Sequence, residues 1–155
     1  MVKFNTHNNT LLIIYSNSNI DVIKGNTITN FSDIKRKNIT ADKTVYNVSF
    51  YNEFAYLATG FGVVVFDTDK LEFKDTYIIG NSGAYLTVYD VARNADTIIA
   101  ATQSGLKSAL LNSNLSNFQN WSNVSGVPAG AYNIVEKYGN YFLANYSSRF
   151  TSSVK

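Results

Sequence analysis

The stretch Leu57-Ala58-Thr59-Gly60-Phe61-Gly62-Val63 returns 43 residues later as Ala100-Ala101-Thr102-Gln103-Ser104-Gly105-Leu106. The same spacing carries one position through four copies, at Ser16, Thr59, Thr102 and Asn145. A repeat of about 40–45 residues with several short strands has the length of one β-propeller blade. The sequence therefore predicts an all-β fold, a β-propeller of four-stranded antiparallel blades. Since closed propellers have about 4–8 blades, 155 residues predict a partial propeller of three to four blades.

Strand-like runs separated by tight polar turns set the limits of the repeat units. The runs rich in β-branched and aromatic residues are 11–16, 20–24, 27–31, 45–51, 55–59, 63–68, 72–79, 86–92, 97–102, 105–110, 131–136 and 141–146, with a weak run at 118–121. We expect one partial N-terminal propeller domain over 1–155, with units at about 4–40, 45–80, 86–121 and, incomplete, 131–155. Helix is expected for a turn or two at most.

Charge and hydropathy argue against a nucleic-acid-binding or membrane-spanning chain. The net charge is +2, but residues 51–100 carry seven acidic groups against three basic ones, so no continuous cationic track is expected. The first apolar run, Leu11 to Tyr15, is too short for a membrane span or a signal sequence. We therefore expect no nucleic-acid partner, no membrane span and no signal peptide in this chain.

The residue types that support catalysis are scarce. Cysteine is absent, and His7 is the only histidine, so neither a thiolate site nor a histidine metal cluster is predicted. Asp67 and Asp69 stand at a strand end, where a cation site is one interpretation and a turn is the favoured one. The sequence predicts no catalytic residues, no metal, no cofactor and no enzymatic activity.

Residues that recur in every unit are expected to build blades rather than a site. Gly62 and Gly105 predict turns with positive φ, and the hydroxyls at position 59 and its copies predict hydrogen bonds to a neighbouring strand. Tyr46, Tyr89 and Tyr132 recur at the period and are expected in the core between blades. Four further aromatic residues fall at turns or strand ends, where packing is favoured over a ligand platform: Tyr51, Phe61, Tyr85 and Trp121.

One basic run stands out in a connection between units, Lys35-Arg36-Lys37. Three adjacent cations can meet an anionic polysaccharide or an acidic protein, and a solvated loop is the alternative. We take Lys35, Arg36 and Lys37 as the candidate binding residues.

Several strings also resemble a known family, the N-terminal propellers of PorZ-type proteins. They are Asn19-Ile20-Asp21-Val22-Ile23, Asp33-Ile34-Lys35-Arg36-Lys37, Asp42-Lys43-Thr44-Val45-Tyr46-Asn47, the run from Ala55 to Val64, and Asp75-Thr76-Tyr77-Ile78-Ile79-Gly80. The similarity covers roughly residues 4–122. It implies a scaffold, a component of the type IX secretion system of Bacteroidetes within an attachment complex that joins anionic lipopolysaccharide to cargo.

That resemblance also implies partners and a location for the full-length parent. The expected partners are other secretion-system proteins and anionic lipopolysaccharide, and the expected location is the cell surface, the outer membrane or the periplasm. Two alternatives stay open. The Thr-x-x-Gly core is similar to that of sensor propellers in two-component regulators, and a propeller glycosidase or lyase would need acids and bases that converge near the axis.

Overall fold

The computed structural model describes residues 1–146, which form four antiparallel sheets, numbered here as blades 1 to 4. Blade 1 has β1 (Val2–Asn5), β2 (Thr10–Ile14), β3 (Ile20–Lys24) and β4 (Thr27–Phe31). Blade 2 has β5 (Val45–Tyr51), β6 (Phe54–Thr59), β7 (Gly62–Asp67) and β8 (Glu72–Tyr77). Blade 3 has β9 (Val88–Arg93), β10 (Thr97–Thr102), β11 (Gly105–Leu110) and β12 (Ser122–Asn123), and blade 4 has β13 (Tyr132–Tyr138) and β14 (Tyr141–Tyr146).

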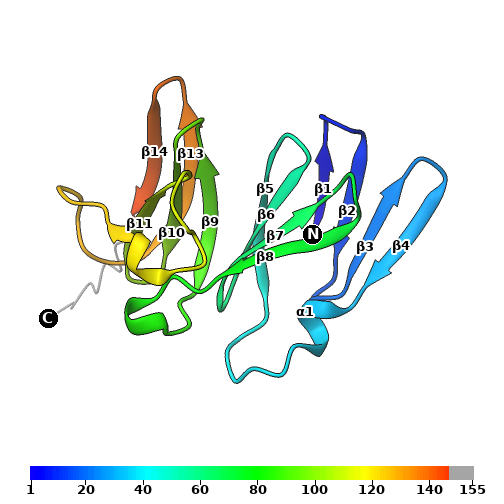
Figure 1. The fold of residues 1–155 in the computed structure, drawn as a ribbon, viewed down its shortest axis with the longest axis horizontal. Helices are drawn as coiled ribbons and strands as arrows, with labels where there is room; N and C mark the ends of the chain where they lie inside the picture. Colours follow the sequence, from blue (N-terminus) through cyan, green and yellow to red (C-terminus); the bar gives the residue numbers. More distant parts are fainter. Residues whose placement is uncertain (147–155) are drawn as a thin grey trace, which may run out of the picture.

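The sheets have the topology of propeller blades. In each sheet, consecutive strands pair in chain order, and Figure 1 shows the four sheets side by side. Helix in the described residues amounts to three short elements, α1 (Asp33–Arg36) and the 3-10 turns η1 (Asn81–Gly83) and η2 (Phe118–Asn120). The predicted all-β partial propeller is confirmed.

Most predicted strands lie within two residues of their observed limits. The weak strand predicted at 118–121 was wrong. Residues 118–120 form the 3-10 turn η2, and β12 follows at Ser122–Asn123. The Asn117 side chain accepts a hydrogen bond from the Gln119 amide at 3.1 Å, which starts the turn. The Trp121 indole donates to the Leu115 carbonyl at 2.9 Å, and this hydrogen bond holds the ring in the core.

The hairpin between the second and third strands repeats closely in blades 2 and 3. The Thr59 hydroxyl donates to the Gly62 carbonyl at 2.8 Å, and the Thr102 hydroxyl donates to the Gly105 carbonyl at 2.7 Å. The two glycines have φ of 142° and 140°, as the sequence predicted. Hydroxyl and glycine therefore close the same turn in both blades.

The 43-residue spacing does not extend unchanged to blades 1 and 4. In blade 1 the turn is one residue longer: the Tyr15 amide donates to the Asn19 carbonyl, and Ser16 lies exposed within the turn. In blade 4, Tyr146 pairs with Tyr132 as Thr102 pairs with Val88, so Tyr146 replaces Asn145 as the fourth copy. The predicted equivalence of Ser16 and Asn145 with the two threonines was wrong because each flanking blade is shifted by one residue.

This shift also corrects the prediction for the recurrent tyrosines. Tyr46 and Tyr89 sit at β-bulges, partly exposed, and their rings meet edge to face at 5.0 Å across blades 2 and 3. Tyr132 instead takes the place of Val88 and is 3% exposed. Only Tyr132 is therefore a core residue between blades, in line with its shifted register.

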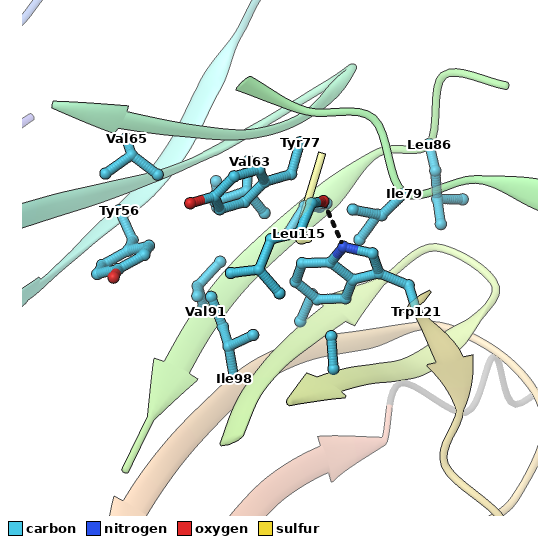
Figure 2. Packing of buried hydrophobic residues seen from close by; sticks show 14 residues of the cluster. Tyr56, Val63, Val65, Tyr77, Ile79, Leu86, Val91, Ile98, Leu115 and Trp121 are labelled. Carbon is cyan, nitrogen blue, oxygen red and sulfur yellow. Dashed lines mark hydrogen bonds between the residues drawn. The ribbon is translucent and has the colours of Figure 1, made fainter. Parts of the chain in front are cut away.

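The hydrophobic core lies between successive blades. One cluster joins blades 1 and 2, a second joins blades 2 and 3, and a third joins blades 3 and 4. Figure 2 shows the second cluster, in which Val63 and Tyr77 of blade 2 face Val91 and Ile98 of blade 3, with Trp121 beside them. β7 is buried along its whole length, because neighbouring blades cover both of its faces.

Candidate functional site

A cavity of about 370 Å³ lies where the first strands of the four blades converge. β1, β5, β9 and β13 each contribute to its wall, which places the cavity near the axis of the array. Five charged residues line it: Lys3, Asp90, Arg93, Glu136 and Lys137. The sequence did not predict this site, because its residues are separated by up to 134 positions and meet only when the blades pack.

Asp90 is the most buried charged group of this axial cavity, at 3% exposure. One carboxylate oxygen accepts hydrogen bonds from the side-chain amide of Asn47 at 2.7 Å, from the Ser49 hydroxyl at 3.3 Å and from the backbone amide of Val91 at 2.9 Å. The other oxygen accepts from the Val135 amide at 3.0 Å. The carboxylate thus joins blades 2, 3 and 4, and its oxygens are engaged in structural bonds.

Arg93 is held at the wall of the same cavity by aromatic side chains. Its guanidinium lies 3.8 Å from the centre of the Tyr51 ring and donates to the Tyr56 hydroxyl at 2.8 Å. Tyr51 is therefore a support for a cation, and such contacts stabilise guanidinium groups without neutralising them. The cavity is polar and charged. The Ser49 hydroxyl donates to the Asp90 carboxylate at 3.3 Å, but that carboxylate also accepts hydrogen bonds from Asn47, Val91 and Val135.

The predicted basic run lies on the connection between blades 1 and 2. Lys35 and Arg36 belong to α1, Lys37 follows it, and all three side chains are exposed. Ile34, 3% exposed, anchors α1 in the first core cluster. Ion pairs within residues 1–146 are Lys24–Asp69 at 3.0 Å and Lys70–Glu72 at 4.0 Å, so neither involves this run. The structure thus presents three cations on an anchored turn.

The other candidate residues fall into structural roles, with one exception. Phe61 and Trp121 are 0% and 4% exposed and belong to the core, whereas Tyr85 is 45% exposed. An Asp67 carboxylate oxygen accepts from the amides of Asp69 and Lys70, both at 2.9 Å, which confirms the predicted turn. Of the four aromatic residues considered as platforms, Tyr85 alone is left open to solvent.

A second aspartate shows how local hydrogen bonds shift pKa values at the surface. Asp42 accepts from the amide of Thr44 at 2.9 Å and from the Tyr46 hydroxyl at 2.7 Å. These two bonds lower the pKa of Asp42, and the bond to Asp42 raises the pKa of Tyr46 to about 12. The pair stabilises the connection into β5.

The described residues hold neither a metal-binding cluster nor a membrane-spanning helix. Residues 1–146 contain no group of three or more histidine, aspartate or glutamate side chains placed to hold a metal ion. They also contain no helix long and apolar enough to cross a membrane. His7 is exposed, and its backbone amide donates to the Asn5 side chain at 3.0 Å.

Four-strand meanders packed face to face around a polar axial cavity define the chain as a β-propeller protein. Residues 1–122 match the family described as the N-terminal β-propeller domain of PorZ of the type IX secretion system. The chain belongs to this family.

Solved structures agree with this assignment. The PorZ of Porphyromonas gingivalis, described as an essential bacterial surface component of the type IX secretion system, superposes with a TM-score of 0.80 at 25% identity. That match covers 92% of this chain and 19% of the PorZ chain, so this chain spans about a fifth of that protein. The computationally designed Ika4 protein has a TM-score of 0.63 at 9% identity, covering 94% of this chain and 82% of its own. The second likeness concerns the fold alone, and no curated protein matches the chain.

Proposed function

We propose that this chain is a non-catalytic scaffold in the surface machinery of a type IX secretion system. Membership of the PorZ propeller family is the observation that carries the proposal. The description of the P. gingivalis PorZ as a surface component supports a place at the cell surface or outer membrane for the parent protein. The Asp90 carboxylate of the axial cavity is buried and accepts four hydrogen bonds that join blades 2, 3 and 4, and this structural role supports a binding function over glycoside hydrolysis or lysis.

The proposal includes the domain organisation. The four units act as one partial N-terminal propeller over 1–155, to which further blades of a longer protein would be added. The core clusters support this, since each blade is covered by its neighbour and each depends on that contact for burial.

Other secretion-system proteins and anionic lipopolysaccharide are the proposed partners, and Lys35, Arg36 and Lys37 are the proposed contact residues. The three side chains are exposed, and neither ion pair within residues 1–146 involves them, so an anionic ligand would not compete with a carboxylate. The buried Ile34 fixes the turn that carries them. A ligand could approach without disturbing a strand.

The test replaces Lys35, Arg36 and Lys37 together by serine and measures binding to purified anionic lipopolysaccharide. We expect several-fold weaker binding at low salt and a much smaller difference near 1 M salt, where the screening length falls to about 3 Å. The thermal midpoint should change little, because exposed cations contribute little to stability.

A matched control removes three exposed lysines elsewhere, Lys70, Lys74 and Lys137, by the same substitution. If both triple variants bind equally at every salt concentration, the run has no special part in binding. If the parent protein shows turnover of a glycoside, the non-catalytic scaffold itself is refuted.

A further inference from the structure

Lys107 is a buried cation in a position that the preceding blade fills with an apolar side chain. It lies in β11, pairs with Ala100 and Asn123, and is 5% exposed. The equivalent residue of blade 2 is Val64, which pairs with Leu57 in the same register and is 3% exposed. The fold therefore accepts valine at this position, and a lysine is not required to build the blade.

The Lys107 ammonium has little compensation for its burial. Its nitrogen donates to the Asn81 side-chain oxygen at 3.1 Å, the one acceptor within residues 1–146, although an ammonium carries three donors. Neither ion pair of the described residues includes Lys107. Burial lowers the pKa of Lys107, as expected for a cation removed from water without a counter-ion.

This cation lines a pocket of about 260 Å³ beside the loop that precedes β9. Asn81, Tyr85, Ser104 and Asn123 line the same pocket, all are exposed, and each carries a hydrogen-bond donor. Among residues 1–146, Lys107 is the only charged residue that lines this pocket, and no carboxylate lines it. The pocket thus opens to solvent with donors at its rim and an unneutralised cation in its wall.

The loop that supplies Asn81 is held in an unusual backbone conformation. Ser82 has φ of 56°, a left-handed value that is uncommon outside glycine and asparagine, and Gly83 follows with φ of 74°. A Cβ at Gly80 would collide with the Ala84 carbonyl oxygen, so the turn leaves no room there for another residue. Such strain persists only where the surroundings impose it, and it often marks sites of ligand contact.

We propose that this pocket binds a compact oxyanion, the phosphate or carboxylate group of a small polar molecule, with Lys107 as its counter-ion. A bound oxyanion supplies the acceptors that the ammonium lacks, and the rim hydroxyls and amides supply donors to its remaining oxygens. The exposed Tyr85 ring can cover an attached sugar or similar ring. This site involves none of the residues of the basic run, so the result of its test does not depend on the scaffold proposal.

The experiment uses the full chain and four probes: inorganic phosphate, acetate, glucose 6-phosphate and glucuronate. We expect saturable binding by calorimetry and slower amide hydrogen exchange in segments 80–87 and 104–107. The first pair of probes compares phosphate with carboxylate, and the second pair shows whether an attached ring improves affinity. Absence of both heat and protection with all four probes at millimolar concentration would overturn the proposal.

Lys107→Met is the decisive variant, since methionine keeps the length of the side chain and removes its charge. Binding should fall at least ten-fold, while the thermal midpoint should stay equal or rise because an unpaired buried charge is lost. Lys70→Met, on an exposed lysine, should leave both unchanged. Retained binding in Lys107→Met refutes the site. If that variant does not fold, the exchange pattern of the unaltered chain with and without phosphate still decides.

Discussion

Gly62 and Gly105 occupy the same turn in successive blades, but their surroundings differ. Both have φ near 140°, which other residues rarely adopt. A Cβ at Gly62 would collide with the Tyr77 carbonyl oxygen, whereas a Cβ at Gly105 would meet no atom of residues 1–146 within 4 Å. The two positions therefore separate the cost of backbone strain from the cost of a steric clash.

Gly105→Ala should lower the free energy of unfolding by about 1–3 kcal/mol, the usual cost of a strained backbone conformation. Gly62→Ala should cost clearly more, because the clash with a backbone atom adds to the same strain. Urea unfolding of the two variants measures the difference. Equal losses would show that the blade 2 turn relaxes freely, contrary to its full burial.

At the scale of elements, the Asp90 carboxylate is the clearest link between blades. It accepts from side chains of β5 and from the backbone of β13, so a single side chain of β9 fixes both neighbouring strands. All of its partners are donors. A side chain of the same shape that carries an amide in place of one oxygen cannot accept all of these bonds.

Asp90→Asn should therefore lower the free energy of unfolding by about 1–3 kcal/mol, the cost of leaving a buried donor without a partner. The amide of Val135 should exchange faster with solvent if the asparagine nitrogen faces it. Asp96→Asn, on an exposed residue of the β9–β10 turn, is the matched control and should change stability little. Similar losses in both variants would argue against the junction.

The sequence predicted strands well where neighbouring residues determine them. The runs at 20–24, 27–31, 45–51, 97–102, 105–110 and 141–146 have their observed limits, since alternating or continuous apolar runs end at turn residues there. The shifts of the flanking blades escaped prediction because one extra residue, in a turn of blade 1 or in the connection to blade 4, leaves the composition of the strands unchanged. Thr-x-x-Gly could not distinguish families either, since its hydroxyl closes a hairpin that any propeller can use.

The candidate sites also divide into those that neighbouring residues determine and those that form only when blades pack. Lys35, Arg36 and Lys37 are adjacent in sequence and were identified from it, and their part in binding stays a prediction. Asp90, Arg93 and Lys107 were not identified, because their partners come from other blades. One signal was present for Lys107: at the 43-residue spacing it stands where the repeat has Val64.

At the scale of the whole molecule, both ends of the array present apolar side chains to solvent. On blade 1, a register row across all four strands consists of Phe4, Leu11, Ile23 and Ile28, and Phe4 and Ile28 are 52% and 66% exposed. On blade 4, the face turned away from blade 3 carries exposed Ile134, Tyr138, Tyr141 and Leu143. Exposed apolar faces of this kind favour association.

We expect the 155-residue chain to self-associate, and a longer protein that covers both faces to be monomeric. Ile134→Lys combined with Leu143→Lys should weaken association at least about ten-fold, since burying one such side chain contributes about 1.5–3 kcal/mol. Sedimentation over a range of concentrations measures this. Asn112→Lys with Ser116→Lys, on an exposed loop, is the control. A monomer at all concentrations, folding cooperatively, would contradict the prediction.

The pairing of strands strictly in chain order has a consequence for how the protein is made. A ribosome adds about 5–20 residues per second, so the 43 residues of one repeat take roughly 2–9 s to emerge, whereas a β-hairpin forms in about 1–10 μs. No sheet of the described residues waits for a strand from a distant part of the chain. Each blade can therefore finish during translation and serve as the surface on which the next blade docks, so that the nascent chain exposes about one unfinished blade at a time.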